Sequence, residues 1–300
     1  MDSATATRKR QDADVTAMRG GSGDPTFAVA LGGGGARGLA HIHVVEALDE
    51  LGLKPKLIAG SSIGAIIGAG YAAGMRGVEI NEYARTILGN RAEVISRIWR
   101  SRPGSLNEFI STGFRVTQFN LPRILRSFLP PVLPERFEEL PIPLLVTGTD
   151  FYGHKVEMFS SGELVSAIAA SAALPAVFRP VKRDGKLYVD GGMFDPVPFD
   201  AVHGKADIVI AVDVVGAPQP GGKRLSSIDL MYGSTQLMMQ AIIQAKLQTY
   251  RPQVLLRPPV SAYRVLDFLK VDALMEETAS IKEEAKRAVA AAVEAFQRQS

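Results

Sequence analysis

Two short apolar runs near the start of the chain are each followed by glycines and then by a helical pattern. The run Phe27–Leu31 ends at Gly32–Gly35, and the run Lys56–Ala59 ends at Gly60. After the first, apolar residues recur at helical spacing, at Leu39, Ile42, Val45 and Leu48; after the second, the segment 63–73 is predicted to be helical. A strand, a tight glycine turn and a helix, repeated in succession, predict a parallel α/β sheet.

The rest of the chain continues this alternation. Further strands are predicted at residues 144–147, 187–189, 208–215 and 254–256. Further helices are predicted at residues 163–173, 226–250 and 272–298. The predicted fold class is therefore α/β, with a central, mostly parallel sheet covered by helices on both faces.

Three regions are expected, which together make one domain. Residues 1–24 are polar and are expected to form a flexible tail, residues 25–205 a core, and residues 206–300 the strands and helices that complete the same domain. Within the core, residues 91–134 form an insertion. Its part from 91 to 128 holds seven arginines against two glutamates and is interleaved with aromatic residues.

Composition excludes several classes of function. The 300 residues include no cysteine, so disulfide scaffolds, thiolate metal sites and cysteine nucleophiles are excluded, and a reducing, cytoplasmic setting is expected. A net charge of +3 on 34 basic and 31 acidic residues is too even for a nucleic-acid-binding protein. Residues 57–75 carry no charge, but their glycines and serines favour a strand, turn and helix over a membrane span.

The most informative motif is Gly60-Ser61-Ser62-Ile63-Gly64, which has the pattern G-x-S-x-G between a predicted strand and a predicted helix. That context is typical of a nucleophile elbow, in which a tight turn presents the serine hydroxyl at the start of the helix. The helix dipole and free amides there favour developing negative charge. The alternative is an ordinary N-terminal turn of a helix.

The glycine-rich turn Gly32–Gly38 also lies between a strand and a helix. Gly33, Gly35 and Gly38 match the pattern G-x-G-x-x-G of dinucleotide-binding proteins. That pattern requires an acidic residue at the end of the second strand, where this chain has Gly60. The second interpretation is that backbone amides of this turn bind an oxyanion.

A serine nucleophile requires a base, and the four histidines lack a convincing context. His41, His43, His154 and His203 are expected to be structural. Asp190 is the better candidate, because it ends a predicted strand and is followed by Gly191 and Gly192, where burial would raise its pKa. The alternative is a plain Asp-Gly turn.

Together these motifs resemble, in the same order, those of the patatin-like phospholipases in their small bacterial form, over about residues 27–203. The resemblance implies that Ser62 is the nucleophile and Asp190 the general base, with no histidine, no metal and no cofactor. Backbone amides of Gly34, Gly35 and Ala36 would form the oxyanion hole, and Arg37 would hold the loop. Supporting motif positions are Gly33, Gly38, Gly60, Gly64, Gly191 and Gly192.

Two positions depart from the family pattern. His43 stands where glycine is commoner, and Asp195 stands before Pro196 where asparagine is usual. A second carboxylate near Asp190 is expected to perturb its titration.

The resemblance implies hydrolysis of a lipid or other acyl ester. The alternatives are a soluble esterase, thioesterase or acyltransferase, and a regulatory protein that keeps the fold without hydrolysis. The insertion is interpreted either as a lid or peripheral contact with an anionic membrane at its inner face, or as an ordinary cap on the core. The oligomeric state is left open.

Overall fold

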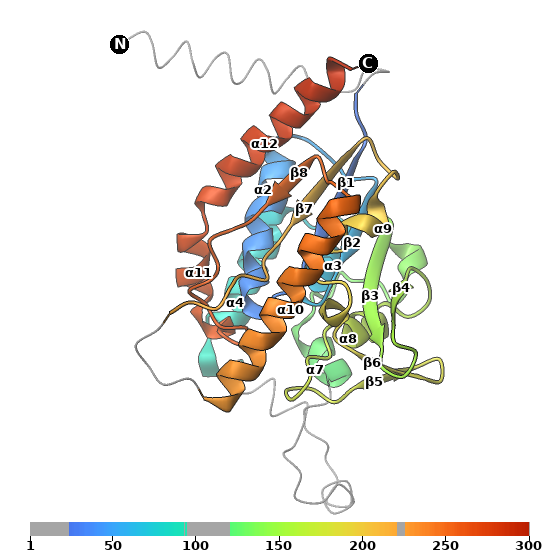
Figure 1. The fold of residues 1–300 in the computed structure, drawn as a ribbon, viewed down its shortest axis with the longest axis vertical. Helices are drawn as coiled ribbons and strands as arrows, with labels where there is room; N and C mark the ends of the chain where they lie inside the picture. The colour runs from blue at the N-terminus through green and yellow to red at the C-terminus, as the bar shows by residue number, and fades with distance from the viewer. Residues whose placement is uncertain (1–23, 93, 95–120, 221–225, 300) are drawn as a thin grey trace, which may run out of the picture.

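An eight-stranded sheet forms the centre of the described part of the chain, residues 24–92, 94, 121–220 and 226–299, in this computed structural model (Figure 1). The strand order is β5-β6-β3-β2-β1-β7-β8, and β4 pairs with β3 outside this path. The strands are β1 (Phe27–Leu31), β2 (Leu57–Gly60), β3 (Leu144–Asp150), β4 (Lys155–Phe159), β5 (Val181–Arg183), β6 (Lys186–Val189), β7 (Ile208–Val212) and β8 (Val254–Leu256). Strands β3, β2, β1, β7 and β8 run parallel, whereas β4 and β6 are antiparallel to β3, and β5 is antiparallel to β6. The sheet is thus mostly parallel, as predicted.

Alternation along β1 divides the core between the two faces of the sheet. Val29 and Leu31 point to one face and join the larger cluster of buried side chains, while Ala28 and Ala30 point to the other face and join a smaller one. Because the second face bears small side chains, helices on that side can approach the sheet closely.

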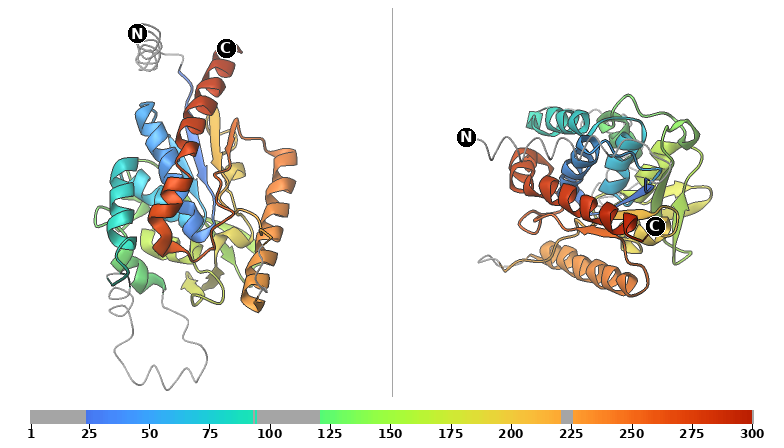
Figure 2. Two further views of the ribbon diagram at one scale, coloured as in Figure 1. Left: turned by 90° about the vertical axis from the view of Figure 1, so that its left-hand side faces the viewer. Right: turned by 90° about the horizontal axis from the view of Figure 1, so that it is seen from above.

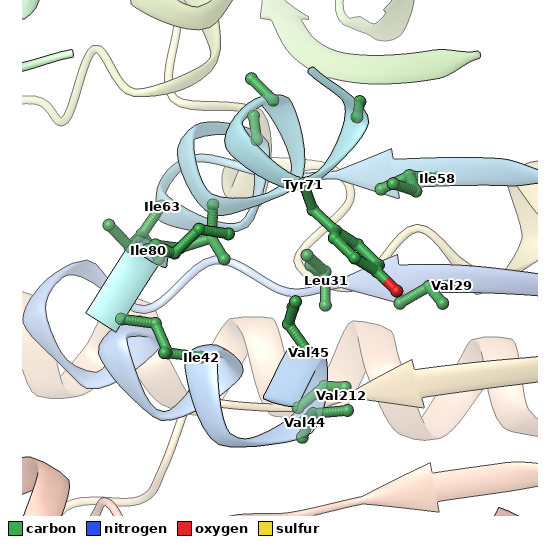
Figure 3. Close-up of a cluster of buried hydrophobic side chains, with 14 of the residues drawn as sticks. Val29, Leu31, Ile42, Val44, Val45, Ile58, Ile63, Tyr71, Ile80 and Val212 are labelled. Carbon is green, nitrogen blue, oxygen red and sulfur yellow. The ribbon is translucent and has the colours of Figure 1, made fainter. Parts of the chain in front are cut away.

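The larger cluster is covered by most of the helices. Figure 3 shows Val29 and Leu31 of β1 and Ile58 of β2 facing Val45 of α2 and Tyr71 of α3. The remaining elements are η1 (Gly35–Ala40), α2 (His41–Glu50), α3 (Ile63–Ala72), α4 (Gly77–Leu88), α7 (Leu121–Phe128), η2 (Phe137–Glu139), α8 (Leu164–Ser171), η3 (Gly191–Met193), α9 (Phe199–Val202), α10 (Ser227–Thr249), η4 (Phe268–Lys270), α11 (Val271–Glu277) and α12 (Ser280–Gln297).

The smaller cluster is covered by α9 and α10. Phe199 and Val202 of α9 pack on the small side chains of the sheet, and α10 adds Met239 and Ile243. In both views of Figure 2, α10 lies at the outside of the molecule. Of this long helix, Met239 and Ile243 are the residues buried in the smaller cluster, so α10 packs on the sheet through one narrow side of the helix.

Several sequence predictions are corrected by the structure. The single helix predicted at 272–298 is two helices, α11 and α12, because the amides of Ala279 and Ile281 bond three residues back, to Glu276 and Thr278, so the i→i−4 ladder is interrupted there. Helix α4 and the short strands β4 and β5 were not predicted. The strand expected at 208–215 ends at Val212.

Other predictions lie partly outside the described residues. These include the tail, residues 1–23, and the part of the insertion from 95 to 120 with four of its arginines. Within the described part of the insertion, residues 121–128 form α7. Residues 57–75 form β2 and α3, as predicted, and among the described helices none has the length and apolarity needed to span a membrane.

Candidate active site

Ser62 occupies a sharp turn between β2 and α3. Its φ of 52° lies in the left-handed region, which is strained for a residue with a side chain. Gly64 permits the turn, because a Cβ there would lie 2.1 Å from the carbonyl oxygen of Leu31. The Ser62 amide donates a 2.8 Å hydrogen bond to the buried hydroxyl of Ser171 on α8, which holds the strained residue in place.

Asp190 lies beside Ser62, although the two residues are far apart in the sequence. It follows β6 and precedes η3, and its Oδ1 accepts a 2.8 Å hydrogen bond from the Gly192 amide. Its Oδ2 accepts the hydroxyl hydrogen of Ser62 at 2.6 Å. Thr149 of β3 donates to the Asp190 carbonyl, so the backbone of this residue is fixed as well. The structure therefore brings together the two side chains for which the sequence predicted chemistry.

The electrostatics of Asp190 suit proton transfer near neutral pH. Only 4% of the residue is exposed, and burial raises its pKa to about 6, against the opposing effect of the hydrogen bonds from Ser62 and Gly192. A carboxylate with such a pKa is ionised at pH 7 and still basic enough to accept a proton.

The glycine turn after β1 supplies unbonded amides beside this pair. Gly34 and Gly35 line the same cavity as Ser62 and Asp190, and their amides make no hydrogen bond within the described residues. Gly35 has a φ of 59°, and a Cβ there would lie 2.2 Å from the Val265 carbonyl oxygen. The loop thus needs glycine at this position.

Ala36 does not fit its predicted place in the oxyanion hole. Its amide donates a 2.8 Å hydrogen bond to the carbonyl of Val265, and the residue is fully buried away from the cavity. Ile63, to which the sequence analysis gave no role, lines the cavity at the first position of α3. Its amide makes no hydrogen bond within the described residues. The G-x-S-x-G motif signals this donor, since the amide after an elbow serine faces the oxyanion in other hydrolases.

Arg37 ties the glycine turn to the C-terminal part of the chain. It is buried; its Nε donates to the Tyr263 carbonyl at 2.7 Å and its Nη1 to the Val215 carbonyl at 2.8 Å. Burial lowers its pKa to about 10, while the Asp267 carboxylate opposes this effect. Arg37 therefore remains charged, and its donors are directed at protein carbonyls.

The histidines have structural contacts. His41 is fully buried with its Nε2 2.8 Å from the Gly32 carbonyl, and burial lowers its pKa to about 4, so the neutral ring donates from Nε2. His43 donates from Nε2 to the Met275 carbonyl, which links α2 to α11. His154 is exposed in a turn, and His203 packs against the ring of Tyr250. Among the described residues, no group of three or more potential metal ligands comes together.

The expected coupling of Asp195 to Asp190 is not found. Asp195 forms a close ion pair with Lys246 of α10, and Asp200 lies on the same ammonium group. Burial raises the Asp195 pKa and Lys246 opposes this. The causes of the Asp190 shift do not include Asp195. This departure from the family pattern thus serves to attach α10.

A cavity of about 670 Å³ opens in front of Ser62. One part of its wall is aliphatic and aromatic and comes from α3, α4, α7 and the segment after α8, with side chains such as Ile67, Ile80, Leu125 and Phe178. Another part is more polar and comes from α10 and the segment before η4, including Tyr232, Gln236 and Asp267. An ester carbonyl at Ser62 would lie between an apolar and a polar region.

The family model described as patatin-like phospholipase matches residues 29–203. An uncharacterized NTE family protein of Mycobacterium tuberculosis is 38% identical over 198 residues, which are 66% of this chain and 51% of that protein. Patatin-like phospholipase domain-containing protein 6 of Homo sapiens is 28% identical over 277 residues, 84% of this chain and 19% of that protein. The chain thus spans about half the length of the mycobacterial relative and a fifth of the human one.

Solved structures with a similar arrangement include VipD from Legionella pneumophila, with a TM-score of 0.44, 14% identity, and coverage of 88% of this chain and 67% of that chain. Human GIVD cytosolic phospholipase A2 gives a TM-score of 0.45 at 12% identity, covering 95% of this chain and 65% of that chain. Since both scores lie below 0.5, the assignment rests on the family model, which matches more than half of the chain. The elbow, the glycine turn and the mostly parallel sheet define an α/β protein with a serine at the turn between a strand and a helix. The chain belongs to the patatin-like phospholipase family.

Proposed function

We propose that the protein hydrolyses acyl esters of lipids with a Ser62–Asp190 dyad. The observation that supports this most strongly is the 2.6 Å hydrogen bond from the Ser62 hydroxyl to Asp190 at the wall of a largely apolar cavity. The family to which the chain belongs supports the same chemistry. Similar proteins include one named lysophospholipase nte1, from Aspergillus fumigatus, and that name describes a lipid substrate.

In the first half of the proposed reaction, Asp190 accepts the Ser62 proton while Ser62 Oγ attacks the ester carbonyl carbon. Negative charge develops on the carbonyl oxygen, and the amides of Gly34, Gly35 and Ile63 are the donors proposed for it. The carbon–oxygen bond to the alcohol then breaks, and the proton on Asp190 passes to the leaving oxygen. The products are an acyl-Ser62 and a free alcohol, such as a lysolipid.

In the second half, water replaces the alcohol. Asp190, again ionised, takes a proton from water as the water oxygen attacks the acyl-Ser62 carbonyl. The bond to Ser62 Oγ breaks, the serine regains its proton from Asp190, and a fatty acid leaves. One carboxylate with a pKa of about 6 serves both steps, so a histidine is not needed.

The cavity wall argues for a lipid rather than a small polar ester. Aliphatic side chains of α3, α4 and α7 surround the space next to Ser62, and transfer of an acyl chain from water into such a space is favourable. A soluble esterase, thioesterase or acyltransferase would use the same dyad. Comparing hydrolysis of one ester as monomers and as micelles separates these activities from a lipase, whose rate rises above the critical micelle concentration.

The decisive experiment is labelling with a fluorescent fluorophosphonate, followed by mass spectrometry of the labelled peptide and an assay of fatty-acid release. Wild-type protein is expected to be labelled at Ser62, and Ser62→Ala and Asp190→Asn are expected to lose both labelling and release. Equal labelling of all three proteins would place the reactive serine elsewhere. Wild-type protein that neither reacts with the probe nor releases fatty acid would favour a regulatory protein of the same fold.

A further inference from the structure

The outward face of α10 has an unusual composition for a surface helix. Leu230, Met231, Leu237 and Met238 are all exposed, with Leu237 60% and Met238 59% exposed. Positions two turns apart lie on the same side of a helix, so these four side chains form one apolar strip. We call these four residues the α10 strip.

The two charged residues of α10 do not contribute to this face. Asp229 accepts hydrogen bonds from Ser226 in the N-terminal capping box, and Lys246 is directed at Asp195 and Asp200. The other exposed positions of α10 carry Ser, Ala, Gln and Thr, all uncharged. Exposed helical faces of soluble proteins normally carry charged side chains, so an uncharged face with large apolar residues indicates a partner.

The same helix forms part of the cavity wall. Tyr232, Gln236 and Met239 of α10 face the cavity that contains Ser62 and Asp190. Leu266, in the segment before η4, also lines the cavity and is 48% exposed. The α10 strip is therefore continuous with the cavity lining around one helix, and a partner bound to the strip would lie beside the cavity entrance.

We propose that the α10 strip and Leu266 form the surface with which the protein docks on a lipid bilayer, α10 lying in the plane of the interface. This deepens the proposed function, since it rests on a lipid substrate that reaches Ser62 from the bilayer. A lipid partner fits because Leu and Met enter the acyl boundary and the neutral Ser and Gln side chains stay at head-group level. Arg264 lies beside α10, where its largely exposed guanidinium is 3.8 Å from the Asp229 carboxylate. Since an exposed ion pair of this length is weak, the same guanidinium can bind a lipid phosphate. A second copy bound here would instead cover the cavity entrance.

The test uses the full chain carrying Ser62→Ala, so that binding is measured without turnover. Co-sedimentation with phosphatidylcholine vesicles containing one-fifth phosphatidylglycerol compares this protein with its Leu237→Gln, Met238→Gln and doubly substituted forms. The matched control is Val78→Gln, which changes an apolar side chain, 43% exposed, at the start of α4. The double variant is expected to bind about tenfold or more weakly, and the control is expected to bind normally. Binding is also expected to persist at high salt, because the strip is uncharged.

Separate readouts exclude the other occupants. Unchanged vesicle binding of the double variant would overturn the proposal, as would binding abolished by salt, which would indicate the basic insertion instead.

Sedimentation velocity showing a wild-type dimer that the double variant disrupts would assign the strip to a second copy. A clear fall in the melting temperature of the double variant would show that the strip packs within its own chain. Hydrolysis of a monomeric short-chain ester, measured with Ser62 intact, tests the dyad independently, so failure of the dyad and failure of the docking surface remain distinguishable.

Discussion

Ser62 donates its hydroxyl hydrogen to Asp190 while its own amide is held by Ser171, so the side chain and the backbone of one strained residue are fixed by two different elements. Asp190 follows β6, which lies between β5 and β3 in the sheet, and Ser171 ends α8. The position of the hydroxyl is therefore set before any substrate binds, which favours a reaction that depends on alignment.

Removing either member of the dyad is expected to abolish turnover. Ser62→Ala removes the attacking oxygen and Asp190→Asn removes the base, and each change should lower kcat by about 10³-fold or more. The control is Ser61→Ala, which changes a neighbouring buried hydroxyl that has no hydrogen-bond partner among the described residues. Ser61→Ala is expected to keep activity within a few-fold of wild type. A loss as large as that of Ser62→Ala would contradict the assignment of the nucleophile.

The pH dependence of activity should follow Asp190. Because burial raises the pKa of this carboxyl to about 6, the base is protonated and inactive at pH 5 and ionised above pH 7. The logarithm of kcat/KM is expected to rise with pH at a slope near one and to level off above about pH 6.5. A profile that is flat from pH 5 to 8 would show that Asp190 is not the titrating base.

The same shift predicts a stability effect of the opposite sign. A folded-state pKa above the ordinary value of 3.8 means that the folded protein prefers the protonated carboxyl, so stability falls as pH rises from about 4 to about 6. Asp190→Asn removes this cost and should raise the free energy of unfolding at pH 7.5 by up to about 3 kcal/mol. Thermal melting of both proteins at pH 4 and pH 7.5 checks this, the difference being expected at the higher pH only.

The dyad was predictable because short motifs in the sequence surround both of its residues. Glycines flank Ser62 and follow Asp190, and such flanks are needed where a backbone turns sharply or other atoms approach closely. The parallel strands were predictable for a related reason, since strands buried on both faces are continuous apolar runs. Polar, half-exposed β4 and β5 lack that signal and were missed. The apolar spacing of α4 at Ile80, Ala84 and Ile87 was present in the sequence but was not interpreted.

The donors around the dyad were harder to predict, because their state depends on distant residues. Ala36 has the same local setting as Gly35, yet its amide is occupied by Val265, which the chain brings back much later. Asp195 was likewise expected to affect Asp190, and its actual partner Lys246 lies on α10. A local motif does not show which distant segment will contact it, so these two partners could not be predicted from the motifs.

Ser171 offers a prediction about positioning. Ser171→Ala removes the acceptor of the Ser62 amide and leaves that buried donor unpaired, which should cost about 1–3 kcal/mol of stability. Because the change loosens the elbow and leaves the cavity wall intact, kcat should fall about tenfold while KM stays within twofold. Ser166→Ala, on the same helix and bonded to Arg183, is the control and is expected to keep wild-type kcat. Equal kcat values for the two variants would remove the positioning role.

Arg37 should resist even a conservative replacement. Its Nε and Nη1 reach the carbonyls of Tyr263 and Val215, and the single ammonium group of a lysine cannot serve both. Arg37→Lys is expected to lower the free energy of unfolding by about 1–3 kcal/mol and to lower kcat, since the glycine turn loses two of its bonds to the C-terminal part of the chain. Chemical denaturation with a parallel activity assay checks both effects. Unchanged stability would show that the two carbonyl contacts contribute little.

The length of acyl chain that the cavity accepts should depend on Ile66. This residue of α3 lines the cavity and is partly exposed to it, so a larger side chain can extend into the empty space rather than into the packed core. Ile66→Phe is expected to lower kcat/KM for a palmitoyl ester about tenfold relative to a butyryl ester, because the long chain loses room that the short chain does not need. The control Ile66→Val enlarges the space slightly and should leave the ratio unchanged. A parallel loss on both esters would mean that the phenyl ring disturbs Ser62 itself, and an unchanged ratio would place the acyl chain along another wall of the cavity.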